Sequence, residues 1–110
     1  MARPVRGDVV VIPFPFSDLT QAKRRPALVL ASPNGDDVIL CQITSQAIRD
    51  RYAVPLTDSD FAQGGLHQTS NVRPNRLFTA DQAIILYRAG GLRSDKLNEV
   101  VERAIEILRA

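Results

Sequence analysis

Three short polar clusters hold the side chains that could do chemistry in this sequence of 110 residues. They are the basic run Lys23-Arg24-Arg25-Pro26, the triplet Thr44-Ser45-Gln46 and the pair Asp81-Gln82. Guanidinium and hydroxyl groups together are typical of a phosphate-binding site, because both donate hydrogen bonds to anionic oxygens. Each cluster also has an ordinary structural interpretation: a solvated basic surface, a turn after a strand, or a pair that caps backbone groups.

The elements that must position these clusters are mostly short strands. Apolar and β-branched runs predict strands at residues 9–12, 27–31, 38–43, 52–56, 70–73, 76–80 and 83–87. We expect Pro13 and Pro15 to end the first strand, and Pro55 to confine the fourth to an edge or an end. The pair Gly90-Gly91 is expected to close the β-rich part of the chain.

A hairpin connects the second and third predicted strands. The segment Pro33-Asn34-Gly35-Asp36 has a strong turn signature, because Asn-Gly adopts positive φ readily. In an antiparallel hairpin the start of one strand lies beside the end of the other. Arg25 and Thr44 are therefore expected at the same end of the sheet.

From Ser94 onward the apolar residues change to a helical period. One stripe contains Leu97, Val100, Val101, Ala104, Ile105 and Leu108, and Ser94 is a suitable N-cap. Several strands followed by one amphipathic helix predict a mainly β fold, in which a small β-barrel packs against the C-terminal helix. A chain of this length forms one domain, spanning residues 1–110.

The composition excludes several classes of protein. With 45% hydrophobic and 24% charged residues the chain is not a disordered one. Its apolar stretch at residues 9–16 is shorter than the ~20 residues of a membrane span, and the N-terminus lacks a signal-peptide pattern, so we expect a cytoplasmic protein. The single Cys41 and the single His67 cannot make a Cys/His metal site, and we predict a core role for Cys41 and no metal or other cofactor.

Positive charge gathers in part of the chain. Residues 66–93 contain four arginines and one acidic residue, whereas the C-terminal segment 94–110 is slightly acidic. This asymmetry permits binding to an anionic polymer such as a nucleic acid, although a solvated surface has the same pattern.

Four segments resemble the MazF/PemK family of toxin ribonucleases in their order and approximate spacing. They are Arg6-Gly7-Asp8-Val9-Val10-Val11, the run Arg24-Arg25-Pro26-Ala27-Leu28-Val29-Leu30, Ile43-Thr44-Ser45-Gln46 and Asp81-Gln82. The resemblance covers nearly the whole chain. It implies an SH3-like barrel that forms a homodimer, and a metal-independent, sequence-specific endoribonuclease that cuts single-stranded RNA such as mRNA. It also implies a cognate, MazE-like antitoxin as partner.

The resemblance assigns site residues by position. Arg25 matches the family's catalytic arginine, Thr44 its catalytic hydroxyl residue, and Asp81 and Gln82 an acid–amide pair near the substrate groove. The positions at which some relatives carry loop bases hold Thr20 and either Leu19 or Arg24, and an arginine before the acid is replaced by Thr79. We therefore take Asp81 as the candidate general base.

RNA cleavage of this kind proceeds by attack of the 2′-hydroxyl on phosphorus, which leaves a 2′,3′-cyclic phosphate and a 5′-hydroxyl. Arg25 would stabilise the charge that develops on the phosphate, and Thr44 would hold one of its oxygens. Amides would read unstacked bases and an aromatic ring would stack on them, while further basic side chains would contact phosphates. The expected RNA-binding residues are Phe16, Lys23, Arg24, Gln46, Asn71, Arg73 and Gln82, with Arg76 as a further phosphate contact.

A second function from another class fits the same barrel. A related branch of this fold poisons DNA gyrase, so the chain is alternatively a non-catalytic toxin or an RNA- or protein-binding module. The presence of both Arg25 and Thr44 favours the nuclease.

Overall fold

The computed structural model describes residues 3–15, 22–47 and 50–110, without the side chains of Pro15 and Ala22. In chain order its elements are β1 (Asp8–Pro15), β2 (Ala22–Ala31), β3 (Asp37–Thr44), β4 (Val54–Leu56), the 3-10 turn η1 (Asp58–Asp60), β5 (Phe61–Gly64), β6 (Ser70–Asp81), the 3-10 turn η2 (Gln82–Ile84), β7 (Tyr87–Leu92) and α1 (Ser94–Leu108). Within these residues no helix is long and apolar enough to cross a membrane.

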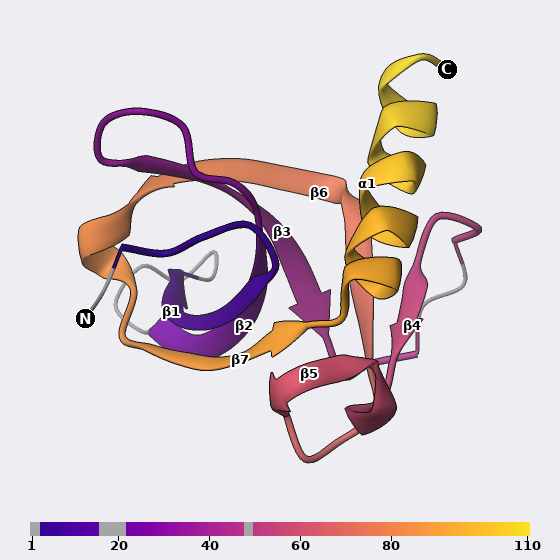
Figure 1. Ribbon diagram of the computed structural model, residues 1–110, viewed down its shortest axis with the longest axis horizontal. Coiled ribbons are helices and arrows are strands. Elements are labelled where there is room, and N and C mark those ends of the chain that lie inside the picture. Colours follow the sequence, from indigo (N-terminus) through magenta and orange to yellow (C-terminus); the bar gives the residue numbers. More distant parts are fainter. Residues whose placement is uncertain (1–2, 16–21, 48–49) are drawn as a thin grey trace.

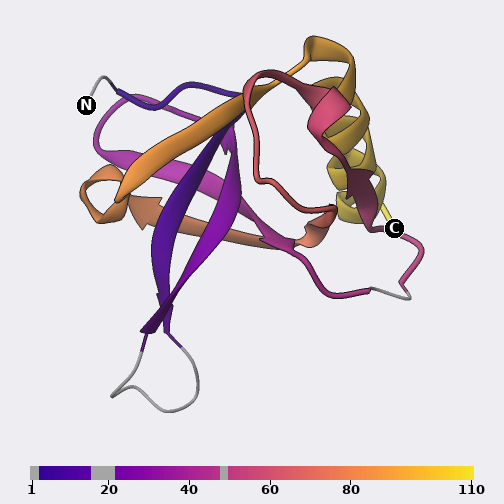
Figure 2. The ribbon, with the colours of Figure 1, turned by 90° about the horizontal axis from the view of Figure 1, so that it is seen from below.

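The seven strands form one antiparallel sheet in the order β4-β6-β3-β2-β1-β7-β5. The sheet curls, so that β6 and β7 pass around β1 and β2 (Figure 1). The result is a half-barrel with one C-terminal helix, which confirms the predicted mainly β fold. Figure 2 shows β1 and β2 running side by side as a long ribbon. The short strand β4, which contains Pro55, lies at an edge as expected.

The first strand is longer than the sequence predicted. We expected Pro13 to end it, but β1 continues to Pro15 and pairs with β2 along its whole length. Pairing of β1 with β7 covers only Asp8–Val11. Beyond Val11, one side of β1 therefore has no strand beside it in the described part of the chain. A proline nitrogen that faces this side removes no hydrogen bond from the ladder.

Strand β6 joins two segments that were predicted as separate strands. Cys41 of β3 pairs with Leu77, whereas the next residue, Gln42, pairs with Arg73, so residues 74–76 have no partner in β3. Such a bulge accommodates Pro74, which cannot donate to a ladder, and it bends the strand. Figure 1 shows β6 turning sharply beside α1.

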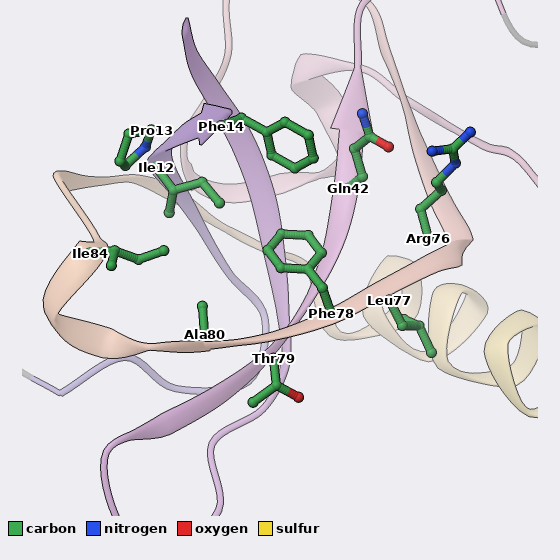
Figure 3. Close-up of a pocket in the computed structure, with 10 residues that line it drawn as sticks. All are labelled: Ile12, Pro13, Phe14, Gln42, Arg76, Leu77, Phe78, Thr79, Ala80 and Ile84. Atoms are coloured by element: carbon green, nitrogen blue, oxygen red, sulfur yellow. The ribbon is translucent and has the colours of Figure 1, made fainter. Parts of the chain in front are cut away.

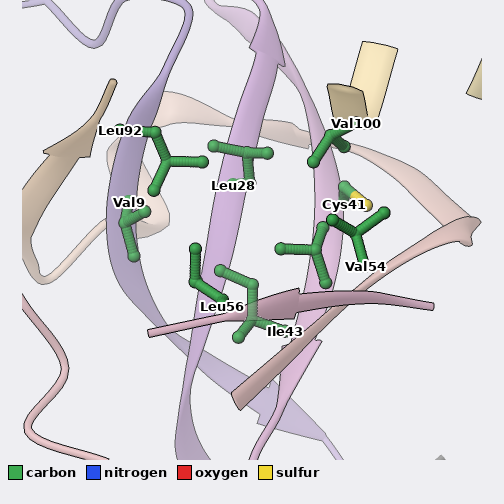
Figure 4. Packing of buried hydrophobic residues seen from close by; sticks show 9 residues of the cluster. Val9, Leu28, Cys41, Ile43, Val54, Leu56, Leu92 and Val100 are labelled. Carbon is green, nitrogen blue, oxygen red and sulfur yellow. The ribbon is translucent and has the colours of Figure 1, made fainter. Parts of the chain in front are cut away.

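Side chains alternate between two faces of the sheet, and each face has its own core. On the helix face, α1 contributes Val100 to a cluster that also contains Val9, Leu28, Cys41, Ile43, Val54, Leu56, Val72 and Leu92 (Figure 4). The inner face, which the curl encloses, carries a second cluster of Val10, Ile12, Ala27, Val29, Val38 and Leu40. Phe14, Phe78, Ala80 and Ile85 pack against this second cluster.

The segment after β6 differs from its prediction. Residues 83–87 were expected to be extended, but the carboxylate of Asp81 accepts a hydrogen bond of 2.8 Å from the N–H of Ala83 and begins η2. Gly90 and Gly91 do not end the β region; both are buried within β7. A Cβ at Gly90 would lie 2.4 Å from the carbonyl oxygen of Gln63, so the close approach of β5 requires glycine there.

Helix α1 follows the predicted stripe except at its two ends. Val100 and Ala104 are buried, but Leu108 is 73% exposed because the last turn extends past the sheet (Figure 1). The N-cap is Arg93, and Ser94, which was expected in that position, is the first helical residue.

Candidate functional site

A row of polar side chains crosses the inner face at the Thr44 end of β3. Thr44 pairs with Asn71 of β6, while Gln42 pairs with Ala27 of β2. Arg25 and Thr44 each lie two residues beyond the Ala27–Gln42 pair on their own strands. Because side chains repeat their direction every second residue, these residues share one face. The geometry therefore brings Arg25, Thr44 and Asn71 together, and we call these three residues the polar row.

The turn after β3 holds the hydroxyl of Thr44 in place. Thr44 is only 7% exposed, and its Oγ1 accepts a hydrogen bond of 3.2 Å from the N–H of Gln46. The side-chain amide of Asn71 donates to the carbonyl oxygen of Gln46 over 3.3 Å. A hydroxyl that accepts a backbone hydrogen bond keeps its own proton for donation. Thr44 is thus oriented and still able to donate to a ligand.

Arg73 lies next to the polar row, where it pairs with Gln42. Its Nη2 donates to Oδ2 of Asp50 over 3.1 Å, and its Nε is buried and has no hydrogen-bond partner among residues 3–15, 22–47 and 50–110. Burial acts to raise the pKa of Asp50, but hydrogen bonds from Arg73 and from the N–H groups of Tyr52 and Ala53 outweigh it and lower the pKa below its usual value. Asp50 is therefore a carboxylate at neutral pH and fixes one end of the Arg73 guanidinium.

Sequence reasoning missed Asp50. No motif surrounds this residue, and the one available signal was an acidic residue shortly after the Thr44 turn. Arg73 was predicted as an RNA contact, and the structure places it on the same face as the polar row.

The basic run at the start of β2 is divided between the two faces. Lys23 and Arg25 pair with Phe14 and Ile12 of β1 and face the inner side, whereas Arg24 points to the other side. A cavity of about 210 Å³ is bordered by both arginines and by polar residues of neighbouring segments, Ser45, Gln68 and Ser70. Guanidinium and hydroxyl groups around one cavity suit a phosphate.

Asp81 and Gln82 lie at the opposite end of β3 from Thr44. Asp81 pairs with Asp37, seven residues before Thr44, which is about 23 Å along the strand. The carboxylate of Asp81 caps η2, and the amide of Gln82 donates to Asp36 over 3.3 Å. The structure therefore separates these two residues from the polar row along β3, and the carboxylate of Asp81 caps η2. The role of Asp81 as general base stays a prediction.

Two further predicted contacts have different outcomes. Phe16 lies outside the described residues. Arg76 is exposed and borders a second, larger cavity on the inner face.

Cys41 and His67 are the remaining candidate groups. Burial raises the pKa of the Cys41 thiol to about 12, against a weaker lowering by a backbone hydrogen bond with Arg73. Cys41 thus has the core role that was predicted. His67 is exposed in a loop with a φ of 63°. Among the described residues no group of three or more His, Cys, Asp or Glu side chains is arranged to hold a metal ion.

Comparison with protein families identifies the group of proteins to which the chain belongs. The family model for the PemK-like, MazF-like toxin of type II toxin-antitoxin systems matches residues 5–108. The chain belongs to this family. The family resemblance inferred from the sequence is therefore confirmed. Comparison with curated proteins gives no match.

Solved structures with the same fold include MazF proteins, alone and with antitoxins. MazF from Deinococcus radiodurans has a TM-score of 0.79 and 23% identity, and the alignment covers 100% of both chains. The MazE-MazF complex of the same organism has a TM-score of 0.75 and 21% identity, over 98% of this chain and 97% of that one. An endoribonuclease in complex with its cognate antitoxin, from a mycobacterial species, has a TM-score of 0.77 and 16% identity, over 96% and 95%. At these identities the likeness establishes the fold.

Proposed function

We propose that this PemK/MazF-like toxin is a sequence-specific endoribonuclease that cleaves single-stranded RNA without a metal ion. The observation that carries the proposal is the placement of Arg25 and Thr44 in one polar row, from strands that the hairpin brings together. Family membership supports it, since solved neighbours of the same fold are named endoribonucleases.

The proposed reaction uses the RNA's own 2′-hydroxyl as nucleophile. Its oxygen forms a bond to the adjacent phosphorus and loses its proton to water, while the bond from phosphorus to the 5′-oxygen breaks and that oxygen takes up a proton. The products are a 2′,3′-cyclic phosphate and a 5′-hydroxyl. Negative charge grows on the non-bridging oxygens in the transition state, where donors held in place in advance have their largest effect.

In this proposal Arg25 and Thr44 supply those donors. The Arg25 guanidinium binds the non-bridging oxygens, and the Thr44 hydroxyl, whose orientation the Gln46 N–H fixes, donates to one of them. Arg24, Lys23 and Arg73 contact neighbouring phosphates. The amide of Asn71 in the row and that of the neighbouring Gln46 meet the edges of unstacked bases, which single-stranded RNA offers.

We extend the proposal to the partners of the chain. A MazE-like antitoxin is its cognate inhibitor, as in the solved complexes of the neighbours, and the toxin acts as a homodimer in the cytoplasm. The antitoxin competes with RNA for the basic surface. Inhibition should therefore weaken as salt concentration rises.

The test is digestion of a long, weakly structured RNA by purified protein in EDTA. Wild-type protein should give discrete fragments that end in cyclic phosphate, and Arg25→Ala should lower the rate by about 10²–10³. Arg109→Ala is the matched control, because Arg109 is exposed at the far end of α1. Intact RNA at high concentrations of wild-type protein would contradict the proposal and favour a non-catalytic binder.

A further inference from the structure

A second cavity opens on the inner face beside the polar row. Its volume is about 440 Å³, within the ~300–1,000 Å³ common for small-ligand sites. It is bordered by the end of β1, by β3, by the segment of β6 after the bulge, and by η2 (Figure 3). None of the expected phosphate contacts except Arg76 lines this cavity, so its chemistry differs from that of the row.

Aromatic and aliphatic side chains make most of the cavity wall. The rings of Phe14 and Phe78 meet edge to face, with centroids 5.8 Å apart and planes at 80°. Figure 3 shows both rings directed into the cavity, together with Ile12 and Ile84. A wall of this kind accepts a flat, apolar face, and an unstacked nucleobase presents one.

Two polar groups stand among these apolar ones. The side chains are the amide of Gln42, which has both donor and acceptor atoms, and the guanidinium of Arg76. Within the described part of the chain no hydrogen bond uses the Gln42 amide, and no carboxylate pairs with Arg76. An amide that offers donor and acceptor side by side matches the hydrogen-bonding edge of a base.

The charge around the cavity fits a ligand attached to a polyanion. Its described lining contains Arg76 and no acidic residue. Lys23 and Arg25 pair with Phe14 and Ile12, which line the cavity, so two further cationic residues are strand neighbours of its lining. A purely apolar occupant would gain nothing from these charges.

We propose that this cavity is a nucleobase-binding pocket that selects one base next to the cleaved phosphodiester. The proposal rests on the proposed function. Gln42 lies two residues before Thr44 on the same face of β3, so a strand whose phosphate is held by the polar row has a neighbouring base at the mouth of the pocket. Phe14 and Phe78 stack on or abut the base, and the Gln42 amide reads its edge.

The experiment measures base preference at each position around the cut. Wild-type, Gln42→Leu and Phe14→Leu proteins digest a pool of short single-stranded RNAs with randomised bases, and the products are sequenced. Gln42→Leu should reduce discrimination by about ten-fold at one position next to the cut and leave the others unchanged. Phe14→Leu should weaken RNA binding and relax preference at that same position. Asn98→Leu, an amide-to-leucine change on the exposed side of α1, is the matched control.

Three outcomes overturn the pocket. If Gln42→Leu and Phe14→Leu both fold and keep the wild-type base preference, the cavity does not bind a base. If the variants lose the mass of a dimer but keep the base preference, a second copy of the chain occupies the cavity. Loss of inhibition by an antitoxin peptide, again with preference intact, assigns it to the antitoxin.

The proposal of a nucleobase pocket and the proposal of nuclease activity can be tested separately. If wild-type protein cuts no RNA, the nuclease proposal falls, and the pocket is then tested by binding of uncleavable 2′-deoxy oligonucleotides that differ in one base. Selectivity that is lost in Gln42→Leu supports the pocket. Equal affinity of wild-type protein for all of them overturns it.

Discussion

At its first residue β3 pairs with Asp81, and at its last residue it pairs with Asn71, so one strand joins two polar ends of the sheet. At the Asp81 end, the carboxylate accepts the N–H of Ala83 and the Gln82 amide bonds Asp36. At the other end, Thr44 accepts from the turn but keeps its proton for donation. Polar side chains at the two ends of β3 therefore differ in what they can offer a ligand: Asp81 and Gln82 bond to neighbouring groups of the chain, whereas Thr44 still has a proton to donate.

The largest expected effect is at the Thr44 end. Thr44→Val keeps the shape of the buried side chain and removes the hydroxyl, so RNA cleavage should slow by about 10²–10³ while the folded state persists. Initial rates on a single-site RNA, with circular dichroism of both proteins, measure this. Thr69→Val removes an exposed hydroxyl elsewhere and serves as control. An unchanged cleavage rate in Thr44→Val would show that the Thr44 end of β3 donates no hydrogen bond that the reaction needs.

Asp81→Ala tests the other end. Loss of the cap on η2 should lower the free energy of unfolding by about 1 kcal/mol, with little change in the rate of RNA cleavage. Urea denaturation and the same cleavage assay check both parts. A rate loss as large as that of Thr44→Val, at unchanged stability, would support the role of Asp81 as general base.

Arg73→Ala sharpens the comparison by its dependence on salt. If Arg73 contacts a phosphate, the slope of log affinity against log salt concentration should decrease by about one. Titration of a short uncleavable RNA at several salt concentrations measures the slope. The same slope in wild type and variant would mean that Arg73 only supports the loop through Asp50.

The smallest expected effect concerns pH. The folded state lowers the pKa of Asp50, so the stability that this carboxylate contributes is present above its unfolded pKa of about 3.9 and is lost as pH falls through the lower folded value. Asp50→Asn should melt below the wild type at pH 7, and the gap should close on acidification towards pH 3. Thermal melts at both pH values check this; a constant gap would contradict the assigned role.

Whether the sequence predicts the position of a site residue depends on how far apart in the chain the contacts that fix this position are. The meeting of Arg25 and Thr44 follows from one local signal, the Asn34-Gly35 turn, because a hairpin fixes which strand ends are neighbours. The position of Asp81 depends on the pairing of β6 with β3 on both sides of a three-residue bulge. Pro74 marks the interruption locally, but no local pattern shows that both segments pair with β3.

Other differences have the same origin. Pro13 remained in a strand because β7 ends its pairing before that point, and Gly90 lies in a strand because β5 approaches it closely. Asp50 became part of the site through a side-chain contact with a residue far along the chain. Burial, strand order and register decide these cases, and they are properties of the folded chain.

The division of Lys23, Arg24 and Arg25 between two faces makes neighbouring basic residues non-equivalent. Deletion of Pro26 would place Arg24 on the face that Arg25 now shares with Thr44, even though the local composition would hardly change. The proposed chemistry therefore depends on the odd–even phase of β2, and the number of basic residues before Pro26 does not determine it.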